Sequence, residues 1–218
     1  MTMDMDYDQQ LSYTASMLFE SSMAVATHLP GLTGLTNETL WTVQGEVLWT
    51  LTGYVIRDFA NQYNPGAREA IEEEFLPIVI SVMLARIFNW QEGTDEAQMS
   101  QHESFLYWFD EAEIGASQTT GFPMSDEAIA AMAETGEIPG DTYVSRLCMR
   151  VARAVQQDGK SELIQGLARA TAEAYASSGF AELATNLATA RRELTTSMVD
   201  SGDADEDEST DPEAPAAP

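Results

Sequence analysis

Apolar residues recur three and four positions apart along most of the chain, which is the spacing of one face of an α-helix. Strictly alternating patterns, which are typical of half-buried strands, are scarce. The sequence therefore predicts an all-α helical bundle of seven to eight helices. The expected helices span about residues 8–28, 36–62, 65–90, 94–117, 125–134, 142–157, 161–177 and 180–199.

Residues that favour helix ends support these boundaries. Side chains suited to cap a helix N-terminus precede several segments, namely Thr36 or Asn37, Thr94 or Asp95, Ser125, Asp141 and Ser161. Asn64 and Pro65 predict the start of the third helix, since proline suits the first helical position. Pro77 leaves two alternatives, a kink within that helix or the start of a new one. In the second helix, Gly45 and Gly53 lie eight residues apart on similar faces, which predicts a close approach of another helix.

The last expected helix carries a short seam of apolar or small residues. Leu183, Leu187, Ala190, Leu194 and the pair at 197 and 198 follow one another at steps of four and three, as in a heptad repeat. The seam covers little more than two heptads. We therefore expect it to pack on an antiparallel helix of the same bundle rather than to form a free coiled coil.

The helical pattern is interrupted near residues 118–124, which contain Gly121 and Pro123, and this indicates a boundary between two helical lobes. We expect an acidic N-terminal lobe over residues 1–118 and a C-terminal lobe over residues 119–199. Residues 200–218 hold eight acidic residues, three prolines and no large apolar side chain, so this tail is predicted to be disordered.

The charge of the chain indicates an unusual solvent. The 218 residues include 36 acidic and 10 basic side chains, for a net charge of −26, and nine of the ten bases are arginine. Such a chain repels itself in dilute buffer, whereas at about 1 M salt the Debye length falls to about 3 Å and screens the repulsion. An acidic surface poor in lysine is typical of the proteins of extreme halophiles. We therefore expect a cellular or viral protein of haloarchaea.

The same charge excludes some classes of partner. A general nucleic-acid coat protein needs positive charge to neutralise phosphates, and so does a protein that binds anionic membranes. The acidic N-terminus lacks the basic start of a secretory signal, and the most apolar stretch, residues 75–90, is too short to span a bilayer. We therefore expect a cytoplasmic or virion-associated protein with no membrane partner.

Basic residues are concentrated late in the chain. Residues 142–192 contain seven of the ten basic side chains and four acidic ones, a net charge of +3. Three arginines of the helix expected over 142–157 are spaced four and three apart, so they share one stripe, which contains no acid. The candidate partner-binding residues are Arg146, Arg150, Arg153, Arg169, Arg191 and Arg192.

Three interpretations of this stripe are open at the level of sequence. The arginines could dock on the acidic part of their own chain, because the planar guanidinium suits such pairs. They could instead bind a protein partner or a second copy of the chain. They could also bind nucleic acid, since residues 125–156 resemble a helix-turn-helix in outline. The connection over 135–141 is longer than the usual turn, however, and the helix before it is acidic.

The chain carries no recognisable catalytic or metal-binding motif. Residues 154–161 match a relaxed phosphate-loop pattern, but the segment before them has a helical pattern and Asp158 would repel phosphate. Neither His28 nor His102 has a glutamate three residues before it, as di-iron bundle sites require. Cys148 is the single cysteine, which excludes an internal disulfide and predicts a buried thiol. We therefore expect no enzyme activity, no cofactor and no metal.

These observations favour a non-catalytic assembly or adaptor protein that binds a protein partner through its basic C-terminal helices. The alternative is a DNA-associated regulator that uses the segment over residues 125–156. A small-molecule enzyme is a third class and would need a pocket with converging polar groups, for which the sequence offers no signal.

Overall fold

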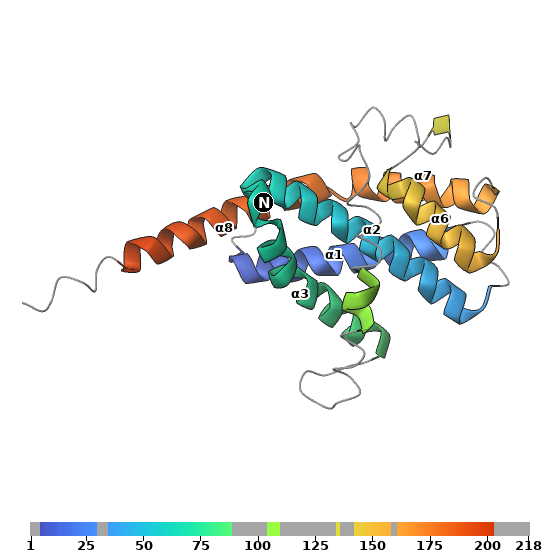
Figure 1. The fold of residues 1–218 in the computed structure, drawn as a ribbon, viewed down its shortest axis with the longest axis horizontal. Coiled ribbons are helices and arrows are strands. Elements are labelled where there is room, and N and C mark those ends of the chain that lie inside the picture. Colours follow the sequence, from blue (N-terminus) through green and yellow to red (C-terminus); the bar gives the residue numbers. More distant parts are fainter. Residues whose placement is uncertain are drawn as a thin grey trace, which may run out of the picture.

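The structure is a computed structural model of the chain, and it describes residues 5–29, 35–88, 104–109, 134–135, 142–157 and 161–202. These residues are almost all helical and contain no strand, which confirms the all-α prediction. The main elements are α1 (Tyr7–His28), α2 (Asn37–Tyr63), the 3₁₀ turn η1 (Pro65–Ala67), α3 (Arg68–Phe88), α6 (Tyr143–Val155), α7 (Glu162–Ser177) and α8 (Phe180–Gly202), shown in Figure 1. None of the described helices combines the length and apolar character needed to cross a membrane.

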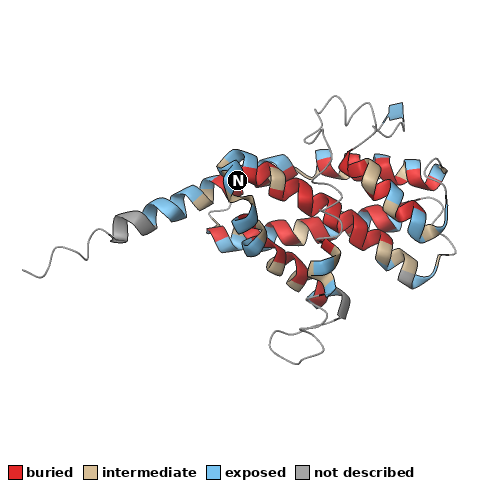
Figure 2. Ribbon diagram, viewed as in Figure 1, coloured by how far each residue is buried: buried red, intermediate tan, exposed pale blue. Residues whose placement is uncertain are grey.

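Helix α2 is the centre of the bundle. It packs against α1, α3, α6, α7 and α8, and Figure 2 shows it buried along most of its length. Its buried apolar side chains lie on more than one face, as Val47, Leu48, Leu51 and Ile56 are all fully inaccessible to solvent. A helix that is apolar around most of its circumference has to be covered on all those sides, so the other helices assemble around α2.

The helix starts follow the capping side chains closely. The Thr36 and Ser161 hydroxyls accept hydrogen bonds from backbone N–H groups three residues later, as predicted. The prediction for α6 is wrong by one residue, since its N-cap is Thr142 rather than Asp141. The Thr142 hydroxyl accepts from the Ser145 N–H at 3.1 Å, and the Ser145 hydroxyl accepts from the Thr142 N–H at 2.9 Å. This reciprocal pair satisfies two N–H groups that the helix itself leaves open.

The two prolines of the third segment behave differently. Pro65 opens the 3₁₀ turn η1, whose N-cap Asn64 accepts the Gly66 N–H. Pro77 lies inside α3, which runs through it as one helix, so no new helix starts there. Proline removes one backbone donor, and burial of Phe75, Val79 and Ile80 on both sides of it stabilises the continuous helix.

Gly45 does allow a close approach, but the group that approaches is an indole ring rather than a helix backbone. A Cβ at this position would lie 2.7 Å from Cζ2 of Trp108 and closer still to Cη2. The Trp108 indole also meets Trp49 edge to face at 6.2 Å, and Phe109 meets Trp49 at 5.6 Å. These aromatic contacts fasten the helical segment 104–109 to α2.

Helix α8 runs antiparallel to α1, as its seam predicts. Ser21, late in α1, lies beside Ser178, whereas Met5 lines a groove together with Glu193. Within the seam, Leu187 is fully buried, while Leu194 is 44% exposed. The far part of α8 projects beyond the other helices (Figures 1 and 2), so only the first part of the seam packs within the chain.

Several predicted segments fall outside the described residues. These are most of the helices expected over 94–117 and 125–134, the boundary near 118–124, and residues 203–218 of the expected tail. The prediction that the tail begins at residue 200 is wrong, because α8 runs to Gly202. The division into lobes over 1–118 and 119–199 stays a prediction. Among the described helices, α2 packs against α6 and α8, so elements from the two expected lobes share one core.

Substitution of two of the helical glycines, Gly45 and Gly166, should have opposite effects on the melting temperature. Gly45→Ala places a methyl group against the rigid Trp108 ring, and overpacking of this kind costs about 1–3 kcal/mol. Gly166→Ala is the matched control, because its Cβ would meet only a Leu29 methyl at 3.6 Å and alanine favours the helix by about 1 kcal/mol. Melting followed by circular dichroism at about 3 M KCl, where charge is screened, should fall for the first variant and rise for the second. A rise for both would contradict the Trp108 contact.

Candidate functional site

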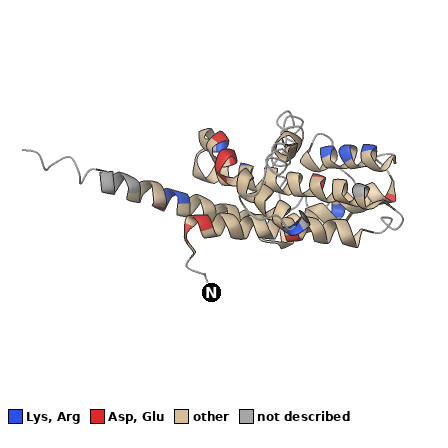
Figure 3. Cartoon of the chain, turned by 90° about the horizontal axis from the view of Figure 1, so that it is seen from below, with Lys and Arg blue, Asp and Glu red and all other residues tan. Residues whose placement is uncertain are grey.

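Helix α6 is strongly amphipathic, with one buried apolar face and one basic face. Val144, Leu147, Cys148, Val151 and Ala152 are buried against α2 and α7. The opposite face presents Arg146, Met149, Arg150 and Arg153, which follow one another at helical spacing and which we name the arginine face of α6. Met149 is 58% exposed, and α6 contains no acidic residue. In Figure 3 the basic residues of α6 lie in a row along the helix.

Arg150 binds a carboxylate of its own chain. Its Nε lies 2.6 Å from Oε2 of Glu46 and a terminal nitrogen lies 2.9 Å from Oε1, so the pair is bidentate. Glu46 is on α2, its side chain is only 7% exposed, and it also accepts the Trp108 indole N–H at 2.9 Å. For Arg150 the structure therefore supports the interpretation in which the arginine docks on its own chain.

Arg146 and Arg153 lie on either side of this anchor. Arg146 is half-buried and interacts within the chain. Arg153 is exposed at the end of α6, and no ion pair of Arg153 is found among the residues that the structure describes. Because Arg150 is held by Glu46, one of the three arginines beside Met149 has a fixed position.

Arg191 and Arg192 belong to another part of the bundle. Arg191 binds Glu74 of α3 at 2.6 Å and lies 4.9 Å from the ring centre of Tyr63. Arg192 donates to the backbone carbonyl of Gln62 and also lies over the Tyr63 ring. Both arginines fasten α8 to α2 and α3, so they do not share a surface with α6.

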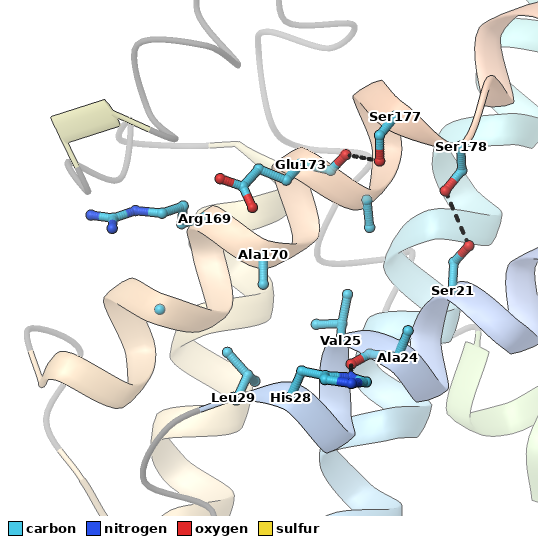
Figure 4. A pocket seen from close by; sticks show the side chains of 12 residues that line it. Ser21, Ala24, Val25, His28, Leu29, Arg169, Ala170, Glu173, Ser177 and Ser178 are labelled. Atoms are coloured by element: carbon cyan, nitrogen blue, oxygen red, sulfur yellow. Dashed lines mark hydrogen bonds between the residues drawn. The ribbon is translucent and has the colours of Figure 1, made fainter.

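Arg169 stands at the rim of a hollow between α1 and α7 (Figure 4). The cavity has a volume of about 480 Å³ and is lined by Ser21, Ala24, Val25, His28, Leu29, Gly166, Arg169, Ala170, Glu173, Ala174, Ser177 and Ser178. Its polar groups bond to nearby atoms, as Ser21 pairs with Ser178 and the His28 ring nitrogen meets the Ala24 carbonyl. Its floor is made of small and apolar side chains, so it presents no set of groups arranged for acid–base catalysis.

A buried polar cluster between α2, α6 and α7 was not anticipated from the sequence. Tyr175 donates its hydroxyl hydrogen to the Asp58 carboxylate, and the rings of Tyr143 and Tyr175 lie about 5 Å from that of Tyr54. Burial raises the pKa of Asp58, against the smaller opposing effects of the Tyr175 hydrogen bond and the Arg57 charge. The sequence offered one signal for the burial of Asp58 and of Glu46, namely that each is an acidic residue within the apolar run of α2.

The Cys148 thiol is buried, as predicted. It is 2% exposed, donates to the Ile164 carbonyl at 3.6 Å, and has a pKa raised to about 12 by burial. A thiol with so high a pKa supplies almost no thiolate at neutral pH, so it is a packing residue rather than a nucleophile.

Removal of the Glu46 charge should destabilise the fold strongly. Glu46→Gln leaves the Arg150 guanidinium partly buried without its carboxylate, and breaking a buried pair in this way costs about 3 kcal/mol. Glu20→Gln is the matched control, because Glu20 meets Arg86 at 3.4 Å with both side chains more than half exposed, and such pairs contribute less than about 1 kcal/mol. Urea unfolding at constant high KCl measures both changes. Equal losses for the two variants would contradict the anchoring role of Glu46.

The Asp58 carboxylate should make stability fall as the pH rises. Because its pKa is raised on folding, the folded chain holds a proton at pH values where the unfolded chain has lost it. Above the ordinary pKa of an aspartate, wild type should therefore lose melting temperature relative to Asp58→Asn until the raised pKa is passed. Thermal melts from pH 4.5 to 7.5 test this, with the exposed Glu69→Gln as control. A difference in melting temperature between wild type and Asp58→Asn that stays constant with pH would contradict the raised pKa of Asp58.

The described residues contain no group of three or more His, Cys, Asp or Glu side chains placed to hold a metal ion. Comparison of the chain with models of protein families, with curated proteins and with solved structures found no match. Within the part of the chain that the structure describes, the arginine face of α6 combines an exposed apolar side chain, Met149, with neighbouring arginines, one of them fixed by an ion pair.

Proposed function

We propose that this chain is a non-catalytic assembly or adaptor protein that binds a protein partner through the arginine face of α6. The observation that carries the proposal is Met149, a large apolar side chain that is 58% exposed among three arginines on a helix without acids. Exposed apolar centres with a polar rim mark interaction surfaces, and methionine and arginine are enriched in them.

The chemistry of the surface indicates the kind of partner. Methionine adapts its shape to irregular apolar groups, and arginine binds carboxylates with two parallel hydrogen bonds. The matching surface is an amphipathic helix with an apolar side chain bordered by Asp or Glu. Arg150 is already held by Glu46, so the exposed Arg153 would supply a new contact to such a carboxylate.

The net charge of −26 supports a setting of high salt. At about 1 M salt, attraction between charges separated by more than about 3 Å is screened, so an interface must rely on direct contact around an apolar centre. The arginine face of α6 meets this requirement, because the apolar Met149 lies among its arginines. We place the protein in the cytoplasm, or in the virion, of an extreme halophile, with no cofactor.

Site-specific cross-linking tests the proposed surface. A photoreactive residue at Met149 should give a discrete cross-linked species in an extract of the producing cells at about 3 M KCl, where only close contacts persist. The same group at Tyr107, which is 66% exposed on another segment, is the control and should give none. Arg153→Gln should reduce the Met149 product at least tenfold, whereas Arg86→Gln should leave it unchanged. Equal products at the two positions would contradict the proposal.

A parallel measurement tests the DNA-associated alternative. Fluorescence anisotropy of a labelled random-sequence duplex, with about 1 M and about 3 M KCl, separates shaped contacts from counterion release, which high salt suppresses. Binding that is lost in Arg146→Gln with Arg153→Gln would replace the adaptor proposal. This double variant keeps Arg150, so the buried pair with Glu46 stays intact.

A further inference from the structure

A groove between α1 and α8 carries a row of polar side chains with an acid at each end. Its volume is about 440 Å³, and we name it the α8 groove, lined by Met5, Gln10, Tyr13, Thr14, Glu182, Leu183, Asn186, Thr189, Ala190 and Glu193. The polar members that belong to α8 follow one another at steps of four, three and four, and they are Glu182, Asn186, Thr189 and Glu193. This spacing places them in one row along the helix.

The α8 groove is negatively charged, and no base lines it. Neither Glu182 nor Glu193 has an ion pair among the residues that the structure describes. The two arginines nearest in the chain, Arg191 and Arg192, are bound to groups of α3 and α2. Both glutamates are exposed, so a ligand can reach them from solvent. Charge therefore favours a cationic occupant.

The polar groups between the two acids are left mainly as hydrogen-bond acceptors. The Thr14 hydroxyl donates to the Gln10 carbonyl at 2.8 Å, and the Thr189 hydroxyl donates to the Thr185 carbonyl at 3.0 Å. The Gln10 amide nitrogen donates to the Met5 carbonyl at 3.0 Å, while its amide oxygen is buried and has no hydrogen-bond partner among the described residues. A buried acceptor is unfavourable until a donor reaches it. The groove therefore suits an occupant that donates hydrogen bonds along its length.

The spacing of the acids sets the length of that occupant. Glu182 and Glu193 are eleven residues apart, which is about 16 Å along a helix, and three turns bring them to the same side. A single ion cannot contact both carboxylates. An extended chain advances about 3.6 Å per three single bonds, so about 13 bonds between two nitrogens match the span. Leu183 and Ala190 offer apolar contact to methylene groups, and the 43% exposed Tyr13 offers a ring that attracts ammonium.

We propose that the α8 groove binds a linear aliphatic polyamine, with its terminal ammonium groups on Glu182 and Glu193. The inner amines of a tetraamine of this length donate toward the side-chain oxygens of Gln10 and Thr189. Protonated amines have donors and no acceptor, which complements the acceptors of the groove. This site is separate from the arginine face of α6, so it does not depend on the proposed function.

Titration calorimetry of the full chain with spermine and putrescine tests the site. The titrations use about 1 M KCl, which screens the general attraction of a cation to a chain of charge −26. One spermine should bind per chain, at least about fivefold more tightly than putrescine, which can reach only one carboxylate. Glu182→Gln and Glu193→Gln should each weaken spermine binding about fivefold. Glu162→Gln removes an exposed acid of α7 outside the groove, so it is the matched control and should leave binding unchanged.

A second variant tests the span at constant net charge. Asn186→Glu combined with Glu193→Gln moves the second carboxylate to four residues from Glu182, a distance of about 6 Å along the helix. The five bonds between the nitrogens of putrescine also span about 6 Å. The ratio of spermine affinity to putrescine affinity should therefore fall at least about fivefold relative to wild type. General attraction to an acidic chain predicts no change in this ratio, because the charge is the same.

Three results would overturn the inference. These are a wild-type chain that does not bind spermine at about 1 M KCl, equal losses of spermine affinity in Glu162→Gln and Glu193→Gln, and an unchanged affinity ratio in the double variant. All the substituted residues are exposed, so each variant should keep its helical circular dichroism, and a loss of binding then reports on the groove itself.

Discussion

The buried carboxylate of Glu46 is the constraint on which the assembly of this bundle depends. A carboxylate removed from water is costly unless it is paired and hydrogen-bonded, and Glu46 meets both needs through Arg150 and Trp108. These partners come from segments 62 and 104 residues away in the chain. One side chain of α2 thus sets the register of α6 and the position of the segment 104–109, while Gly45 leaves room for the indole ring.

The same chemistry explains why the basic residues do not form a single surface. Arginine serves this acidic chain as an internal connector, as Arg150 joins α6 to α2 and Arg191 joins α8 to α3. Each connector is directed at a particular carboxylate or aromatic ring. What is left for external contacts is a smaller surface, with Met149 and Arg153 outward and Arg150 fixed beneath them.

Much of the fold could be predicted from local signals. The ends of α1, α2 and α7 follow from side chains that cap a helix or interrupt it, because these act on backbone groups within a few residues. The one-residue error at α6 has the same origin, since Asp141 and Thr142 are both good caps and only the reciprocal bond with Ser145 selects Thr142. The candidate site was less predictable, because spacing puts three arginines on one stripe but does not reveal which one meets a carboxylate.

The sequence by itself therefore determined the all-α class, the approximate ends of α1, α2 and α7, the buried thiol and the amphipathic character of α6. Tertiary structure alone decided that Glu46 and Asp58 are buried and partnered, that Gly45 receives an indole ring, and that α8 extends past the helices it packs on. The physical reason is the distance along the chain over which each interaction acts. Helix formation and capping are governed by neighbours in the chain, whereas the pairing of a buried charge depends on side chains that only the packed bundle brings together.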